Sequence, residues 1–241
     1  MQKVYAIFGA AGGIGSVLAK RLSEMGNVVY LLGRNTAKLE QLSQEISQPY
    51  ITTDATDETL VEKALQQIVE KEGQLDGVVS LIGSIFLKPI SLTSQKEFEE
   101  VMKTNTTSSF CILKHALRLM KKGSIVLSSS AASCIGLANH ESIAAAKAAV
   151  IGMMRAAAAS YATKGIRINA VAPGLTRTPL AEAITSNETA LKASTSFHPM
   201  GRIGEPEDVA AAIFWLLSEE SSFVTADVIT IDGGLSSIKL R

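Results

Sequence analysis

Short runs of apolar residues alternate along the chain with longer segments in which apolar residues recur at helical spacing. The apolar runs are continuous, which is typical of strands buried on both faces of a sheet. They lie at Val4–Phe8, Val28–Leu32, Val78–Ile82, Ile125–Leu127, Ile168–Ala172 and Val228–Ile231, with a weaker candidate at Tyr50–Thr52. The helical patterns lie at Gly13–Met25, Ala37–Ile46, Glu58–Lys71, Gln95–Met120, Ser142–Tyr161 and Pro206–Leu217. This alternation predicts an α/β fold, in which a doubly wound parallel sheet carries helices on both faces.

No internal repeat, low-complexity tract or Pro/Gly-rich linker interrupts the alternation. We therefore expect a single domain over residues 1–241, because one α/β sheet commonly reaches this length.

The helical segment Ser142–Ser160 has almost no polar face, since only Lys147 and Arg155 are charged. A helix on the surface of a globular protein normally has one. We expect one side of this helix to pack on the sheet and the other to meet a second copy of the chain. An alanine-rich helix selected only for helix propensity would show the same composition.

The overall composition is that of a folded protein without a nucleic-acid partner. Apolar residues make up 46% of the chain, which excludes general disorder. The 23 basic residues balance 23 acidic ones, which argues against binding to nucleic acid or to an acidic membrane surface. The first residues enter a strand pattern without a signal peptide, and no apolar run reaches the roughly 18 residues of a membrane span. We expect a cytoplasmic protein.

The cysteines and histidines predict neither a disulfide framework nor a metal site. Cys111 and Cys134 form no CxxC pair. His115, His140 and His198 are far apart, without metal-ligand spacing.

A glycine-rich turn follows the first predicted strand and opens the first predicted helix. Glycines there allow a tight turn and leave the backbone open to a ligand, and the helix amides suit a pyrophosphate. The spacing is GxxxGxG, and its place in a strand–turn–helix unit favours a nucleotide site over a turn without a ligand. The cofactor-binding residues predicted here are Gly9, Ala11, Gly13, Ile14 and Gly15.

The ends of the next two strands carry residues suited to the adenosine part of a dinucleotide. Gly33 and Arg34 stand where an acidic residue would bind the ribose hydroxyls of NAD. Arginine can pair with a 2′-phosphate, which favours NADP(H) and leaves NAD(H) possible. Asp54 follows the third strand and could accept the adenine amino group. A solvated Arg34 and a helix-capping Asp54 are the alternatives.

These segments resemble the short-chain dehydrogenase/reductase family over essentially the whole chain. The resemblance rests on motifs in the family's order: GAAGGIG (9–15), Asp54, LDGVV (75–79), the Asn105 region, GSIVLSSS (123–130), AAAKAAV (144–150), GIRINAVAPGLTRTPL (165–180), RIGEPEDVA (202–210) and ITIDGG (229–234). It implies a Rossmann-type seven-stranded parallel sheet, a nicotinamide cofactor and commonly a tetramer, so that we expect a homotetramer or a homodimer.

The resemblance also implies a catalytic group of Asn, Ser, Tyr and Lys. Asn105 matches the Asn that kinks a helix and holds a water in a proton relay. Ser130 matches the Ser that hydrogen-bonds the substrate oxygen. Lys147 matches the Lys that holds the nicotinamide ribose and lowers the pKa of the tyrosine. The tyrosine itself is missing, because both the spacing to Lys147 and the spacing to Ser130 lead to Ile143.

Another residue must then handle the proton. Tyr161 lies fourteen residues beyond Lys147, roughly 21 Å along a helix, and is rejected. His140 shares a helix face with Ile143 and Lys147 if helical geometry reaches that far back, and imidazole exchanges protons near neutral pH. A water held by Lys147 and Asn105, or a group of the substrate, is the alternative source.

Three further segments are implied to meet the cofactor or the substrate. Gly83 would allow the backbone to approach the adenosine side of the cofactor. The residues implied to line the nicotinamide are Pro173, Gly174, Thr176 and Thr178. Residues 179–199 would form a mobile substrate lid, which carries no dominant charge.

The sequence thus predicts an NADP(H)-preferring oxidoreductase that moves hydride between nicotinamide and a small-molecule carbonyl or alcohol. The rival interpretation is a non-catalytic nucleotide-binding protein on the same fold, acting through regulation or interaction. The presence of Ser130 and Asn105 beside Lys147 favours the enzyme, because a pure binder needs only Lys147 for the ribose.

Overall fold

A computed structural model describes residues 2–239 of the chain. Within this part, the central sheet has seven parallel strands in the order β3-β2-β1-β4-β5-β6-β7. They are β1 (Val4–Phe8), β2 (Val28–Gly33), β3 (Tyr50–Thr52), β4 (Gly77–Ser80), β5 (Gly123–Ser128), β6 (Ile166–Pro173) and β7 (Val228–Ile231). The order reverses between β1 and β4, which confirms the doubly wound fold and opens a crevice at their carboxyl ends.

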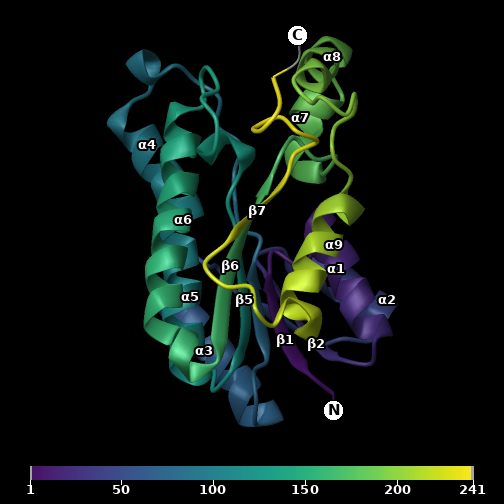
Figure 1. Ribbon diagram of the computed structural model, residues 1–241. Coiled ribbons are helices and arrows are strands. Elements are labelled where there is room, and N and C mark those ends of the chain that lie inside the picture. Colours follow the sequence, from purple (N-terminus) through teal and green to yellow (C-terminus); the bar gives the residue numbers. More distant parts are fainter. Residues whose placement is uncertain (1, 240–241) are drawn as a thin grey trace.

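Helices cover both faces of the sheet (Figure 1). They are α1 (Gly13–Glu24), α2 (Thr36–Ile46), α3 (Glu58–Glu72), α4 (Gln95–Met102), α5 (Ser108–Leu119), α6 (Glu141–Tyr161), α7 (Glu182–Thr185), α8 (Glu188–Ser196) and α9 (Pro206–Leu217). Apolar residues of α3, α5 and α6 form one core layer with the sheet, and those of α1, α2 and α9 form the other. The continuous apolar runs are explained by this double covering, since every strand residue of β1 is buried.

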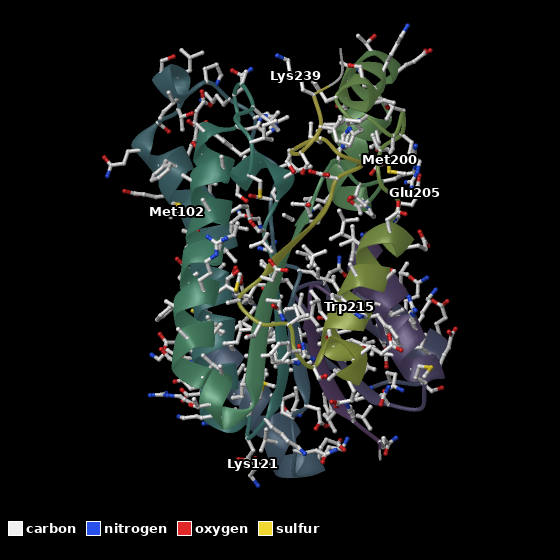
Figure 2. All side chains as sticks on the ribbon, in the orientation of Figure 1. Met102, Lys121, Met200, Glu205, Trp215 and Lys239 are labelled. Carbon is white, nitrogen blue, oxygen red and sulfur yellow. The ribbon has the colours of Figure 1, made fainter. Side chains whose placement is uncertain are left out.

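The carboxyl ends of the parallel strands face one end of the molecule. Lys121 comes just before β5 and lies at the lower end in Figure 2, so the strands begin there. Met200 and Lys239 lie towards the upper end, where α7 and α8 also gather (Figures 1 and 2). The segments implied to hold cofactor and substrate follow the strands and therefore meet at that upper end.

The predicted helix Gln95–Met120 is divided in the structure. Between α4 and α5, residues Lys103–Thr107 form one π-helical turn. This turn widens the helix around Asn105, whose side-chain amide donates to the Val101 carbonyl at 2.9 Å. The hydroxyl of Ser109 donates to the Asn105 carbonyl at 3.0 Å. Side chains thus satisfy carbonyls that a continuous α-helix would bond through its backbone.

The long helix α6 belongs to the core. By length and composition alone, Glu141–Lys164 would suit a membrane span, with a mean hydropathy of 1.3. Polar residues interrupt the apolar ones, so the segment contains no long continuous apolar run. In the structure, Val150, Ile151 and Met154 are buried in the core layer shared with α5 and the sheet. Its apolar character on this side is that of a helix face packed inside a folded protein, while other residues of α6 are exposed in the single chain.

Candidate active site

A cavity of about 560 Å³ lies at the carboxyl end of the sheet. Twelve residues that the sequence assigns to the site line it: Gly9, Gly13, Ile14, Gly15, Gly83, Ser130, His140, Lys147, Pro173, Gly174, Thr176 and Thr178. Four others do not line it: Ala11, Arg34, Asp54 and Asn105. The structure therefore brings together most of the residues predicted from both halves of the chain.

The glycine-rich turn between β1 and α1 is closed by backbone contacts. Gly9 has a φ of +84°, a conformation that favours glycine, and its amide donates to the Leu32 carbonyl at 2.8 Å. A Cβ on Gly15 would run into the Gly9 carbonyl and lie 2.8 Å from the Cα of Ala10. A Cβ on Gly13 would lie 2.8 Å from a methyl group of Thr178. The glycines thus leave bare backbone at the start of α1, which suits a bound anion.

The ends of β2 and β3 place charged groups beside this turn. Arg34 is exposed, just before Asn35, which caps α2 by accepting the Lys38 amide. Asp54 accepts two hydrogen bonds from Thr56 through one carboxylate oxygen. Partial burial raises the pKa of Asp54, but these bonds and the positive charge of Arg34 outweigh it and lower the pKa. The helix α3 is capped by another residue, so Asp54 keeps one oxygen for a ligand.

Asn105 supports the cavity from behind its wall. Its side chain is fully buried and forms hydrogen bonds with both the backbone and the side chain of Ser84. The Oδ1 accepts the Ser84 amide at 3.1 Å, and the Nδ2 donates to the Ser84 hydroxyl at 2.9 Å. Ser84 itself lines the cavity. Asn105 therefore fixes the loop after β4 and reaches the cavity through Ser84.

Lys147 enters the cavity from α6. Its Nζ donates to the carbonyls of Ile82 at 3.1 Å and Ser128 at 3.0 Å, which ties α6 to the ends of β4 and β5. A Cβ on Gly83 would lie 3.2 Å from this Nζ, so the loop passes close to the ammonium group and an added methyl group would crowd it. Burial lowers the pKa of Lys147 to about 8.

Ser130 and Ile143 stand on the same wall. The Ser130 hydroxyl accepts the Ala132 amide at 3.2 Å and keeps its own proton for donation into the cavity. Ile143 is buried in a small apolar cluster with Val101 and Phe86. Of the residues that the structure describes, no tyrosine lines the cavity. The position four residues before Lys147 therefore contributes an apolar surface.

His140 lies at the amino end of α6 and lines the cavity. Its Nδ1 lies 2.7 Å from the Ala138 carbonyl, which only a protonated Nδ1 can bond. The Nε2 is then an acceptor in the neutral ring.

The far end of the cavity is made of apolar side chains from separate segments. The loop after β4 contributes Phe86, the loop before α6 contributes Leu137, and residues 179–199 contribute Leu180, Ile184 and Phe197. The last stretch folds into short helices, α7 and α8, instead of an irregular loop. Within residues 2–239, no Asp, Glu or Arg lines the cavity.

Sequence reasoning assigned no role to several of these wall residues. His198 is buried, with its Nδ1 bonded to the Ser194 carbonyl at 2.8 Å and its Nε2 packed against Gly174. Ser84 and Phe86 follow β4 in a segment without a distinctive pattern. Their roles depend on contacts with distant elements, which one sequence does not display.

The chain is similar to one reductase family model and to curated dehydrogenases and reductases. Residues 9–236 match a family model described as "Enoyl-(Acyl carrier protein) reductase". A cis-4-hydroxycyclohexanecarboxylate dehydrogenase from Sinomonas cyclohexanicum is 34% identical, over 98% of each chain. A 3-oxoacyl-(acyl-carrier-protein) reductase from Thermotoga maritima is also 34% identical, over 97% of each chain.

Solved structures of similar chains show the same fold. A short-chain type dehydrogenase/reductase from Mycobacterium ulcerans superposes with a TM-score of 0.94 at 33% identity, covering 98% of this chain and 90% of that one. The protein ElxO with NADP bound superposes with a TM-score of 0.92 at 33% identity, covering 99% of this chain and 100% of that one.

Proposed function

This chain belongs to the short-chain dehydrogenase/reductase family, and from that premise we propose that it is an NADP(H)-preferring oxidoreductase acting on a neutral carbonyl or alcohol. Its named relatives are dehydrogenases and reductases, so the non-catalytic rival finds no support there. The observation that carries the proposal is the shared cavity. Ser130 and a buried Lys147 face the same space as the glycine-rich turn.

The residues of the turn fit a dinucleotide. The crowding that a Cβ would cause at Gly13 and Gly15 marks a backbone cradle, and the start of α1 offers amide groups to a pyrophosphate. Asp54 would hold the adenine and Arg34 the 2′-phosphate, which is the reason for the NADP preference. The relative ElxO binds NADP in its structure. When bound, the cofactor would supply or accept the hydride.

The chain's own residues would orient the ligand. Ser130 would donate a hydrogen bond to the substrate oxygen, and Lys147 would hold the nicotinamide ribose. Asn105 would fix the Ser84 loop and organise water near the proton path. Pro173, Gly174 and the two threonines after them would line the nicotinamide side. His140 lines the cavity, and its role as proton donor stays a prediction.

The substrate would be uncharged and largely apolar. Phe86, Leu137 and Phe197 line the far end of the cavity, and no acidic or guanidinium side chain of the described residues joins them. A cavity of that kind offers apolar contact and, within the same described part, a single lysine, Lys147, for an anionic group. Two relatives are named for substrates built on a six-membered carbon ring, one of them a carboxylate and the other an uncharged diol, and the apolar lining of this cavity favours the uncharged kind. We propose an alicyclic ketone or alcohol as the substrate class.

Steady-state oxidation of NADPH with a panel of carbonyl compounds tests this function. We expect turnover with neutral alicyclic ketones, and at least tenfold lower kcat/KM for analogues that carry a carboxylate. NADH should give a lower kcat/KM than NADPH with the same ketone. Tight NADPH binding without turnover on any carbonyl or alcohol would instead support the non-catalytic rival.

We also propose self-association through α6. Its outward face presents small residues, among them Ala145, Ala148 and Gly152, which are exposed in the single chain. Such a face allows a second helix to approach closely, in a homodimer or a homotetramer. A cytoplasmic location stays a prediction, as does movement of the 179–199 segment as a lid.

A further inference from the structure

A second cavity, of about 340 Å³, adjoins the active-site cavity, and we call it the side cavity. It lies between the loop after β4 and the helix α4, which packs beside α6 at the upper end of the molecule (Figure 1). Ser84, Ile85 and Phe86 line both cavities. This short stretch of chain is therefore a wall that the two cavities share.

The shared wall is fixed at its two ends by hydrogen bonds. At one end, the Ser84 amide and hydroxyl are bonded to the buried Asn105 side chain at 3.1 Å and 2.9 Å. At the other end, the Lys88 amide donates to the Asn139 carbonyl at 2.9 Å. The Nζ of Lys88 donates to both carboxylate oxygens of Glu97, at 2.8 Å and 2.9 Å. The loop is thus attached to the core at its start and to α4 at its end.

Between these ends, residues 85–87 are held by side-chain packing. Within residues 2–239, their backbone groups form no hydrogen bond. Ile85 and Leu87 are 40% and 47% exposed, and Phe86 packs against the small cluster that contains Ile143 and Val101. A stretch without backbone hydrogen bonds to the rest of the fold opens at low cost. The middle of the shared wall can therefore yield to a ligand while its ends stay in place.

An apolar surface connects the two cavities across this wall. Ile143 lines the active-site cavity, Val101 lines the side cavity, and Phe86 lines both. The three side chains belong to one packed cluster. The apolar lining thus continues from position 143 past the Phe86 ring and into the side cavity.

The polar rim of the side cavity has balanced charges. Lys96 and Glu100 are both exposed and lie one turn apart on α4. Glu97 is already paired with Lys88. An ionised group that entered the side cavity would lose its water without meeting an uncompensated opposite charge. The side cavity therefore suits an uncharged, apolar ligand.

We propose that the side cavity is a subsite for an alkyl arm of the substrate, and that Phe86 controls which arms enter it. The inference rests on the proposed reduction of an alicyclic ketone and names its substrate more closely, as a ring ketone that carries an unbranched alkyl chain. The ring occupies the active-site cavity, and the chain passes the Phe86 ring along the apolar surface from Ile143 to Val101. Each methylene group that is buried there strengthens binding.

Steady-state reduction of cyclohexanone and its 4-alkyl derivatives by NADPH tests the subsite. We expect kcat/KM to rise about tenfold or more from cyclohexanone to 4-butylcyclohexanone, because the butyl chain leaves water for an apolar surface. The branched isomer, 4-tert-butylcyclohexanone, is too wide to pass the Phe86 ring and should have a kcat/KM about tenfold below that of the butyl compound. Equal values of kcat/KM for the three ketones overturn the proposal.

A variant of α4 locates the alkyl arm. Glu100→Trp places an indole at the side cavity, so the advantage of 4-butylcyclohexanone over cyclohexanone should fall below about threefold. The matched control is Glu99→Trp, the same change at the preceding residue, which lines neither cavity and should keep the full advantage. A Glu100→Trp protein that also keeps the full advantage overturns the proposal. So does one in which self-association, measured by sedimentation equilibrium, changes and the alkyl preference does not.

A variant of the shared wall tests the control by Phe86. Phe86→Ala removes the ring between the two cavities, so kcat/KM for 4-tert-butylcyclohexanone should come within about threefold of that for 4-butylcyclohexanone. The matched control is Leu87→Ala, which removes an apolar side chain that lines the active-site cavity and not the side cavity. This control should keep the discrimination against the branched arm. Equal discrimination in wild type and Phe86→Ala removes Phe86 from the proposal.

Binding without turnover separates this inference from the proposed function. Thr104 lines the side cavity and not the active-site cavity, so its methyl group reports on the subsite alone. In NMR spectra of threonine-methyl-labelled protein with NADP⁺, 4-butylcyclohexanol should shift the Thr104 resonance, and cyclohexanol should leave it unchanged. Ketone reduction without this shift overturns the subsite and keeps the proposed function. The shift without turnover of any ketone overturns the proposed function and keeps the subsite.

Discussion

The two ends of the cavity are built in different ways. At the nucleotide end, the wall is mostly backbone, and its glycines lie within the seven residues from Gly9 to Gly15. At the substrate end, the wall consists of side chains such as Phe86, Leu137 and Phe197, which come from three separate segments. The backbone wall at the nucleotide end leaves almost no room for an added side-chain atom. At the substrate end, the effect of a substitution depends on the size and polarity of the new side chain.

The largest expected effect comes from adding one methyl group to the glycine-rich turn. In Gly15→Ala, the new methyl group would meet the Gly9 carbonyl and the Ala10 Cα, so the turn must shift. We expect NADPH affinity to fall at least 100-fold and the free energy of unfolding to fall by about 2–3 kcal/mol. Fluorescence titration and urea unfolding measure the two values.

The matched control lies in the loop at the substrate end. A Cβ on Gly136 would meet no atom of the described residues within 4 Å, and the φ of Gly136 is not in the left-handed region. Gly136→Ala should therefore change NADPH affinity by less than twofold. Equal losses in the two variants would show that the two ends do not differ as described.

The second prediction removes one polar group from the substrate end. Ser130→Ala should lower kcat/KM for ketone reduction about 100- to 1,000-fold, the range found when one donor to a developing oxyanion is removed. NADPH affinity should stay within threefold. The control, Ser142→Ala, removes a buried hydroxyl that has no hydrogen-bond partner among residues 2–239 and does not line the cavity, so activity should be unchanged. Full activity of Ser130→Ala would exclude it as the donor.

The same contrast explains what the sequence could predict. The strands and the glycine-rich turn were predictable because their signals are local: a continuous apolar run, or glycines at fixed spacing after a strand. The break at Asn105 was implied only by the family resemblance, because the side-chain bond to Val101 leaves no trace in the apolar pattern of one apparent helix, Gln95–Met120. The roles of Ser84 and Phe86 were not predictable, because packing between distant segments creates them.

A third prediction concerns the effect of the buried Lys147 on the free energy of unfolding. Burial lowers the pKa of Lys147 from 10.5 to about 8, so the ammonium form is disfavoured in the folded protein. The cost is on the order of 3 kcal/mol, is fully present below pH 8, and disappears as pH rises towards 10.5. The free energy of unfolding of wild-type protein should therefore rise across this window.

Lys147→Met removes the charge and keeps much of the buried volume. This variant should be more stable than wild type at pH 7 and should lose the rise between pH 8 and 10.5. Urea unfolding at several pH values checks both effects. A less stable variant at pH 7 would show that the bonds to the Ile82 and Ser128 carbonyls outweigh the desolvation of the charge.

A fourth, smaller effect concerns the exposed Arg34, which we propose to hold a 2′-phosphate at the nucleotide end. Arg34→Asp should lower the preference for NADPH over NADH about tenfold, because the carboxylate repels a 2′-phosphate and can bind ribose hydroxyls. The control Lys38→Asp makes the same charge change one turn further along α2 and should alter the preference by less than twofold. Dissociation constants for both cofactors decide the outcome, and a preference that does not change would remove Arg34 from the phosphate site.

The smallest predicted effect concerns α6, whose two faces differ as the two ends of the cavity do: one is built of side chains and the other exposes backbone. Its inner face fills space with Ile143 and Lys147. On its outer face, no neighbouring element among residues 2–239 lies within 4 Å of the place that a Cβ on Gly152 would take. On a free helix, Gly152→Ala would stabilise the chain by about 1 kcal/mol. If a second copy packs closely there, the methyl group instead separates the helices and weakens association by a similar amount. We expect the second result, seen as about fivefold weaker self-association in sedimentation equilibrium. Unchanged association together with a higher Tm would show that this face is open to solvent, and that close backbone approach is confined to the nucleotide end.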